Sequence, residues 1–198
     1  MNEYANNTHN PAEQVSDWHI ALRYLEDGYK RYIENRGITR NTNAHDRETL
    51  KVGQKPFAVI VTCSDSRVSP EIYFDQKLGD IFVIRNAGNI ADTTTLGSIE
   101  YAVTHLKVPL VVVVGHSRCG AVNGALNSGE YSENLQIVIN TIRSVTKDSK
   151  TLEDAVHANI DHVVKRISEN KIIKRMGAKV IGAYYNVESG EVTMKSDS

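Results

Sequence analysis

The two cysteines of this 198-residue chain, Cys63 and Cys119, each follow an apolar run, and His116 lies three residues before the second. Thiolate and imidazole together favour zinc in tetrahedral geometry. Three protein ligands leave a fourth position open, as catalytic zinc sites do, whereas structural sites more often have four. A cysteine that ends an apolar strand is also a common core residue. We expect a catalytic zinc site if the fold brings the three side chains together.

Asp65 and Arg67 come directly after the first cysteine. An aspartate beside zinc has two possible roles: it fills the fourth coordination position, or it accepts a hydrogen bond from a zinc-bound hydroxide. In the second role Arg67 would hold it by a charge-assisted fork. The alternative is a surface ion pair worth at most about 1 kcal/mol. Zinc lowers the pKa of a bound water to roughly 7, so such a site makes a nucleophile at neutral pH.

The segments before these residues predict the elements that position them. Residues 57–62 and 110–114 are continuously apolar, as strands covered on both faces of a parallel sheet are. Their carboxyl ends would carry Cys63 and His116, at the edge where open α/β sheets keep their sites. Further strands are expected at 81–84, 179–185 and 191–194, the last antiparallel, with helices between the strands. The fold class is therefore α/β, with a mainly parallel central sheet flanked by helices and an antiparallel edge strand.

The N-terminal region predicts a helical arm. Asn10 as N-cap and Pro11 at the first helical position would start a helix that ends near Gly37 and carries one long apolar stripe. Residues 1 to about 9 are polar and expected to be loosely docked, and residues 38–56 are loop-like. We expect a single domain over 1–198, with a tail and helical arm at 1–37 and an α/β core at 53–195.

Composition excludes several classes of partner. Lys and Arg number 23 and Asp and Glu 24, which gives a formal net charge of -1. This balance gives no electrostatic reason to expect nucleic acid or an anionic membrane as a partner. No window approaches the roughly 18 apolar residues of a membrane span, and no signal peptide is recognisable. Two cysteines in such a chain are expected to be free thiols of a cytoplasmic protein.

Five segments of the chain carry a resemblance to a known family. They are Gln54-Lys55-Pro56, Cys63-Ser64-Asp65-Ser66-Arg67-Val68, the run from Gly79 to Asn89 that ends in Arg85-Asn86-Ala87-Gly88-Asn89, the run from Gly97 to Val103, and Gly115-His116-Ser117-Arg118-Cys119-Gly120. Together they span residues 53–123 almost without interruption. In this order they make the chain resemble the β-class carbonic anhydrases.

This resemblance implies a function and a role for each matching residue. The function is zinc-dependent reversible hydration of carbon dioxide to bicarbonate and a proton, by attack of a zinc-bound hydroxide. Zn²⁺ would be held by Cys63, His116 and Cys119, while Asp65 and Arg67 would form the dyad that orients the hydroxide. Gln54 matches a glutamine that contacts substrate. Phe82, Ala87 and Tyr101 match positions that line the small apolar cleft, and Gly88 lets its loop approach closely. The family also implies a homodimer or homotetramer.

Three alternatives stay open at this point. Some members of the family have an inactive form in which the aspartate, here Asp65, coordinates zinc, and bicarbonate at a second site stabilises it. That site uses a tryptophan where this chain has Ile60, beside an arginine that corresponds to Arg85, so the chain departs from the pattern for bicarbonate regulation. Relatives of the family hydrolyse carbon disulfide or carbonyl sulfide. A zinc-stabilised binding domain would show a broken ligand or dyad, and none is broken here.

Overall fold

The computed structural model describes residues 8–11, 13–38 and 44–195. Its five strands form one sheet in the order β2-β1-β3-β4-β5, in which β1 to β4 are parallel and β5 is antiparallel to β4. The strands are β1 (Ala58–Cys63), β2 (Ile81–Asn86), β3 (Leu110–His116), β4 (Lys179–Tyr185) and β5 (Val192–Met194). The expected fold class, a mainly parallel α/β sheet with an antiparallel edge strand, is confirmed.

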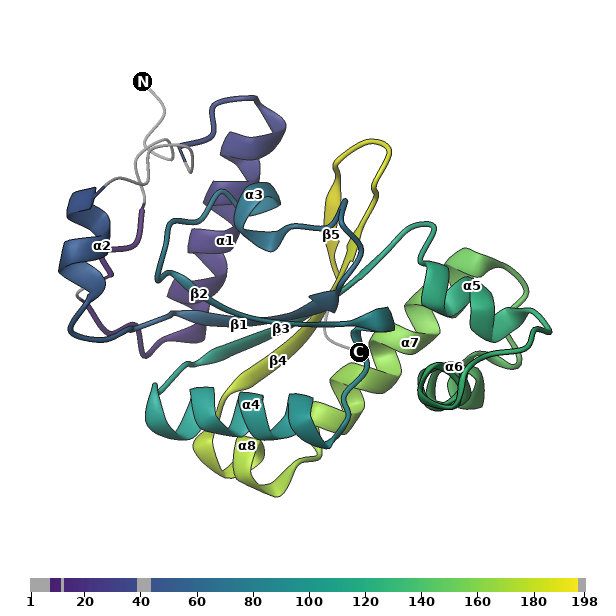
Figure 1. Ribbon diagram of the computed structural model, residues 1–198. Coiled ribbons are helices and arrows are strands. Elements are labelled where there is room, and N and C mark those ends of the chain that lie inside the picture. The colour runs from purple at the N-terminus through teal and green to yellow at the C-terminus, as the bar shows by residue number, and fades with distance from the viewer. Residues whose placement is uncertain (1–7, 12, 39–43, 196–198) are drawn as a thin grey trace.

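Helices cover both faces of this sheet. They are α1 (Trp18–Ile33), α2 (Ala44–Leu50), α3 (Pro70–Tyr73), α4 (Thr93–His105), α5 (Gly120–Leu126), α6 (Glu133–Thr146), α7 (Leu152–Ser168) and α8 (Lys171–Met176), with a 3-10 turn, η3 (Ala87–Asn89), after β2. Figure 1 shows α1 and α3 on one face and α4, α7 and α8 on the other. Each face has its own apolar core, so the sheet separates two cores.

The central strands β1 and β3 are buried along their whole length. Because side chains alternate across a strand, Val59 and Val61 face the core under α4 and α7, while Ile60 faces the core under α1. Both faces are covered, which explains why these segments are continuously apolar. The buried hydroxyl of Thr62 donates to the carbonyl of Val114, 3.1 Å away, and so remains hydrogen-bonded inside the sheet.

Helix α7 lies unusually close to the sheet because glycines face it. A Cβ atom at Gly115 would lie 2.6 Å from Ile160 Cγ1, and one at Gly182 would lie 2.7 Å from Ile160 Cγ2. Both separations are far below a van der Waals contact. The Ile160 side chain therefore occupies the space that larger residues in β3 and β4 would fill.

The N-terminal arm differs from the expectation at its start. Helix α1 begins at Trp18, where the Asp17 side chain caps it by accepting the His19 backbone N–H at 2.8 Å. Asn10 instead accepts the Glu13 backbone N–H at 2.9 Å, which closes a turn. The prediction of a helix from Asn10 was wrong because the same residue types serve turns and helix starts. The Lys179 ammonium lies 5.3 Å from the centre of the Trp18 ring, at the amino end of β4.

His9 docks the chain ahead of that helix, contrary to the expectation of loose docking up to about residue 9. Its Nδ1 lies 2.9 Å from Asp80 Oδ1, its Nε2 lies 3.2 Å from the Glu13 carbonyl oxygen, and its ring packs against Phe57. The residue is only 4% exposed. Residues 1–7 of the expected tail lie outside the described residues.

Two further expectations need correction. Residues 38–56 contain α2, a short helix without an apolar stripe, so the periodicity of the sequence could not reveal it. Helix α8 is separate from α7, because Asn170 caps its amino end by accepting the N–H groups of Ile172 and Ile173. Helix α5 follows directly after Cys119, between β3 and α6.

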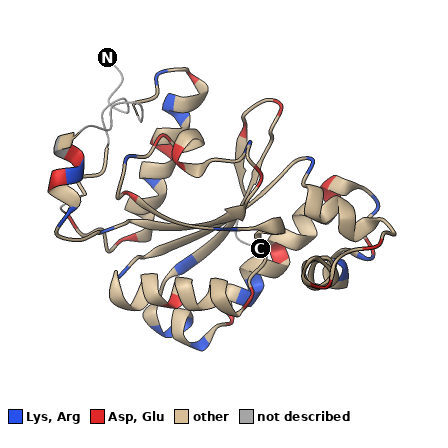
Figure 2. Cartoon of the chain, in the orientation of Figure 1, with Lys and Arg blue, Asp and Glu red and all other residues tan. Residues whose placement is uncertain are grey.

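Charged side chains of both signs lie interspersed over the helices and loops (Figure 2). Within the part of the chain that the structure describes, we find no helix of the length and hydropathy that crossing a bilayer requires.

Candidate metal centre

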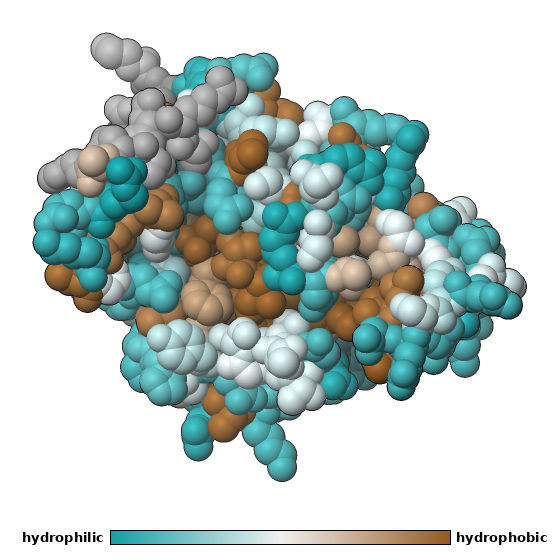
Figure 3. Space-filling model, viewed as in Figure 1, coloured by the Kyte–Doolittle hydropathy of each residue, from teal (hydrophilic) through white to brown (hydrophobic). Residues whose placement is uncertain are grey.

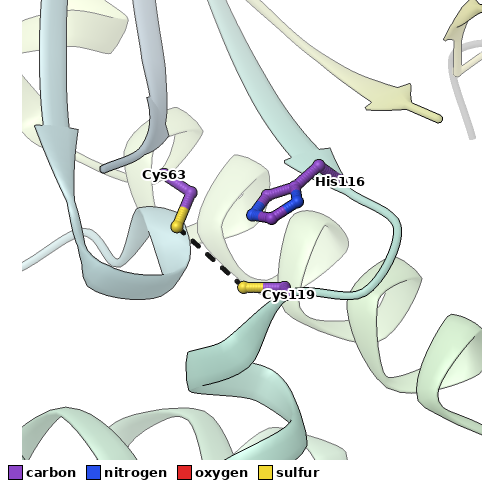
Figure 4. Close-up of side chains that lie close together, drawn as sticks. All are labelled: Cys63, His116 and Cys119. Atoms are coloured by element: carbon purple, nitrogen blue, oxygen red, sulfur yellow. Dashed lines mark hydrogen bonds between the residues drawn. The ribbon is translucent and has the colours of Figure 1, made fainter. Parts of the chain in front are cut away.

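The topology brings Cys63, His116 and Cys119 together. Cys63 ends β1 and His116 ends β3, and because these strands are parallel neighbours, both ends lie at one edge of the sheet. Cys119 follows as the N-cap residue of α5. The potential ligand atoms of the three residues all lie within 4.8 Å of one another, and all three residues are buried (Figure 4). Their arrangement matches the zinc ligand set expected from the sequence.

The imidazole of His116 is oriented as a metal ligand would be. Its Nδ1 lies 2.9 Å from the Ser117 carbonyl oxygen, which can only accept, so Nδ1 carries the proton. Its Nε2 therefore presents a lone pair, and this buried atom has no hydrogen-bond partner among the described residues. Metal-binding histidines usually donate their other ring N–H to a carbonyl or carboxylate, which fixes the tautomer in this way. The orphaned nitrogen and the two thiols fit zinc.

The two sulfur atoms lie 4.0 Å apart, within reach of an S–H···S hydrogen bond. The hydrogen bond from Cys119 lowers the pKa of Cys63, and the hydrogen bond from the Gly88 N–H lowers it further. The same pairing, together with burial, raises the pKa of Cys119. One thiol thus ionises readily while the other retains its proton. A divalent cation between the two sulfurs would replace that proton and stabilise both thiolates.

Asp65 lies beside these ligands and is held by Arg67 at both carboxylate oxygens. Arg67 Nε donates to Oδ1 at 2.9 Å and Nη2 donates to Oδ2 at 2.7 Å, while the Arg67 backbone N–H also donates to Oδ1. These donors hold the pKa of Asp65 well below its usual range. Among the described residues, the group of ligand atoms within 4.8 Å does not include Asp65. The dyad is therefore closed, and the carboxylate lies outside the cluster.

The segment that carries the dyad is fixed by Arg85, a residue that the sequence indicated only for a second bicarbonate site. Its Nε donates to the Cys63 carbonyl at 3.1 Å and its Nη2 donates to the Asp65 carbonyl at 2.8 Å. Arg85 thus bridges from β2 to the first ligand and to the dyad, and it limits the movement of both.

The loop after β2 forms one wall of the site. The Asn86 side chain accepts the Ile90 N–H and donates to the Ile90 carbonyl, each at 2.8 Å, which closes the loop on itself. Gly88 within it has φ 73°, a left-handed conformation that favours glycine, and its N–H donates to Cys63 Sγ at 3.4 Å. The exposed Ala87 precedes Gly88, so both residues lie at the metal edge of the sheet.

The other three residues predicted to contact substrate lie away from this edge. Phe82 pairs with Val59, four residues before Cys63 on β1, which corresponds to about 13 Å along the strand. The Tyr101 ring lies 6.3 Å from the Phe82 ring and is 46% exposed. Gln54 is exposed and precedes β1, nine residues before Cys63. Within one chain, these three residues do not join the metal ligands.

One buried side chain near the site was missed by the sequence reasoning. Asn159 of α7 donates to the Gly88 carbonyl oxygen at 2.9 Å and is 2% exposed. A signal existed, because the amide interrupts the apolar stripe of Val156, Ile160 and Val163. A polar residue on the buried face of a helix needs a hydrogen-bond partner, although the sequence does not reveal which one.

Comparisons with known proteins agree with this geometry. The carbonic anhydrase family matches residues 58–192. Carbonic anhydrase 2 of Mycobacterium tuberculosis is 54% identical over 106 residues, which cover 54% of this chain and 51% of that protein. The chain thus spans about half the length of that relative. A carbonic anhydrase of Mycolicibacterium smegmatis is 37% identical over 192 residues, which cover 89% of this chain and 92% of that protein.

A solved structure gives the same result at the level of the fold. It is described as one of two tetrameric beta-carbonic anhydrases from the filamentous ascomycete Sordaria macrospora, with 28% sequence identity and a TM-score of 0.70. The match covers 89% of this chain and 94% of that one. Because the family model covers more than half of the chain and the Mycolicibacterium relative is matched over nearly its full length, the chain belongs to the β-class carbonic anhydrase family.

Proposed function

We propose that this chain is a zinc enzyme that interconverts carbon dioxide and bicarbonate. The observation that carries the proposal is a buried Cys₂His group with an unpartnered histidine nitrogen, beside a closed aspartate–arginine pair. A zinc ion bound there would act as a Lewis acid and make a nucleophile from water near neutral pH. Its ligands would be Cys63, His116 and Cys119.

The remaining roles belong to side chains around the open fourth position. Because Arg67 donates to both oxygens of Asp65 and lowers its pKa, the carboxylate stays ionised and acts as a hydrogen-bond acceptor that orients the nucleophile. Ala87 and Gly88 give a small apolar wall. Such a wall suits carbon dioxide, which offers little to hydrogen-bond.

The rest of the substrate cleft is proposed to come from a second copy of the chain. Phe82 and Tyr101 are partly exposed and too far along the sheet to reach the metal ligands of their own chain. Strand β2 is half-buried almost throughout, and its outer edge is unpaired within the described ranges. Hydrophobic side chains gather across the middle of the molecular face in Figure 3. An open apolar edge of this kind favours association.

We therefore propose a homodimer or homotetramer of single-domain subunits spanning 1–198. The Sordaria relatives are described as tetrameric, which supports an assembly of this kind. We propose a cytoplasmic location, and the formal net charge of -1 gives no electrostatic reason to expect nucleic acid or an anionic membrane as a partner.

The test measures zinc content and carbon dioxide hydration by stopped flow on the purified full chain. We expect about one tightly bound zinc per chain and activity that a strong chelator removes and zinc restores. Carbonyl sulfide and carbon disulfide serve as competing substrates. Faster turnover of either sulfur compound, or a chain without zinc, would contradict the proposal.

Two variants distinguish the residues that bind the metal from the residue that orients the nucleophile. His116→Ala should lose both zinc and activity, because it removes a ligand. Asp65→Ala should retain zinc and lose about 100-fold or more in kcat/KM, a typical loss when a group that orients a reactant is removed. Asp161→Ala, which removes an exposed partner of Lys195, is the matched control and should leave both unchanged. Full activity in Asp65→Ala would exclude a role for the dyad.

A further inference from the structure

The backbone of Gly88 connects a metal ligand to a distant helix through two adjacent peptide units. On one side its N–H donates to Cys63 Sγ at 3.4 Å. Its left-handed φ of 73° suits glycine, and a Cβ atom there would lie 2.5 Å from Ile142 Cδ1. The residue is buried, so water does not compete for these groups. The direction of this N–H therefore depends on what holds the loop in place.

Asn159 holds the other side of Gly88. Its Nδ2 donates to the Gly88 carbonyl oxygen at 2.9 Å, across 71 positions of the sequence, and the side chain is 2% exposed. A second residue of α7, Arg166, donates from Nε to the Ala91 carbonyl at 2.6 Å. Helix α7 thus binds this loop at two carbonyls. Of these two contacts, only the one from Asn159 reaches Gly88, the residue whose N–H contacts Cys63 Sγ.

We propose that Asn159 is a positioning residue of the metal centre, which acts through Gly88 on the Cys63 sulfur. Its amide fixes the peptide unit that follows the Gly88 Cα, which restricts rotation about Gly88 and so helps to hold the N–H of the preceding peptide unit against Sγ. The inference rests on the proposed zinc site and is independent of which gas is the substrate. No proton, electron or bond is transferred in this role.

Loss of the Asn159 amide should change the affinity of the site for zinc and the hydrogen bonding of the Cys63 sulfur. A hydrogen bond to a thiolate withdraws electron density from sulfur and restricts its orientation, and loss of such outer contacts typically weakens metal binding about 10- to 100-fold. Without the amide, the Gly88 carbonyl loses its buried partner and the loop is free to rotate. The N–H would then no longer be held against sulfur.

The test compares Asn159→Ala with Arg166→Met in the full chain. The readouts are zinc affinity by chelator competition and the thiolate-to-metal absorption band of the cobalt-substituted protein. Asn159→Ala should weaken zinc binding about 10-fold and shift the cobalt band. Arg166→Met removes a contact to the same loop from the same helix and should leave the cobalt band in place.

Asn159→Leu is the second variant, because it keeps the buried volume and removes the amide if the alanine variant does not fold. Thr146→Val, which removes a buried hydrogen bond within α6, controls for general loss of stability. Wild-type zinc affinity and an unshifted cobalt band in an Asn159 variant would overturn the inference while the proposed function stands. Equal effects of Arg166→Met would also overturn it. A wild-type chain that binds no zinc would overturn both proposals.

Discussion

Most of the buried polar side chains considered above have a hydrogen-bond partner inside the protein. The hydroxyl of Thr62 and the amide of Asn159 each have a hydrogen-bond partner inside the fold. The hydroxyl of Tyr73 is an exception, since it is buried and has no partner in the described ranges. Its ring nevertheless stacks on Tyr185, with ring centres 4.7 Å apart. The ring of Tyr73 therefore contributes packing, whereas burying a hydroxyl without a partner costs free energy of folding.

Tyr73→Phe should accordingly stabilise the protein by about 1 kcal/mol at pH 7, because it removes an unsatisfied buried hydroxyl. Burial raises the pKa of Tyr73. An unfolded tyrosine ionises near pH 10, so above that pH the unfolded state releases its proton first and wild-type stability falls. The Phe variant should lose less stability between pH 9 and 11. Urea unfolding followed by circular dichroism at each pH measures both effects.

Tyr24→Phe serves as the reference for the effect of removing a tyrosine hydroxyl, because Tyr24 does not stack on Tyr185 as Tyr73 does. A Tyr73→Phe variant that is less stable at pH 7, or whose stability falls as steeply in alkali as that of the wild type, would show that the Tyr73 hydroxyl has a partner.

Among the elements, α7 fits closely against the sheet. It packs Ile160 onto the glycines of two neighbouring strands and carries the amide that binds the metal-site loop. The close approach and the loop contact depend on each other, because a helix farther from the sheet would place Asn159 out of reach of Gly88. The glycines of β3 and β4 thus contribute to the geometry of the site.

Gly115→Ala should destabilise the metal-free protein by about 1–3 kcal/mol, as overpacking of a core does. The added Cβ would lie 2.6 Å from Ile160 and 3.1 Å from Val156. Gly97→Ala is the matched control: its Cβ would have no atom within 4 Å, and it lies within α4, so a gain of about 0.5–1 kcal/mol is expected. Urea unfolding in the presence of chelator measures both, and equal stabilities would refute the close fit.

The elements also show what the sequence could and could not predict. Strands β1 and β3 were predicted because burial on both faces requires continuous apolar residues. The start of α1 was mispredicted because Asn10 and Pro11 suit a turn as well as a helix, and α2 lacks an apolar stripe. The contact of Asn159 with Gly88 joins residues 71 positions apart. Only the folded chain shows which partner a buried amide has.

On the scale of the whole molecule, the two ends of the sheet have different roles. The carboxyl edge carries Cys63, Asp65 and His116, whereas Gln54 lies before β1 at the amino edge. Gln54 and Cys63 both belong to the family's sequence pattern, but the sequence does not show that they lie at opposite ends of β1 in one chain. Residues that match one pattern can therefore belong to two different sites of the same subunit.

Mixed assemblies test whether the cleft is completed by a second copy. His116→Ala lacks a metal ligand but keeps the lining, and Gln54→Ala lacks part of the lining but keeps the ligands. Coexpressed in equal amounts, they should recover roughly a quarter of wild-type activity, because in a symmetric dimer half of the molecules are mixed and each has one intact site. Activity is measured by stopped flow against each variant purified alone.

His116→Ala coexpressed with Cys119→Ala is the control, since both variants lack a ligand and mixing cannot create an intact site. If the first mixture is no more active than the average of its parents, each chain completes its own cleft.

Trp18 gives the molecule an optical reporter of its own. It is the single tryptophan of the chain, at the start of α1, and its indole lies against Lys179 at the amino end of β4. His116 ends the adjacent strand β3 and pairs with Tyr185 at the opposite end of β4. Intrinsic fluorescence therefore follows the docking of the N-terminal helix at a point remote from the metal ligands. Detachment of that helix and loss of the ligand cluster can thus be followed separately in one unlabelled sample.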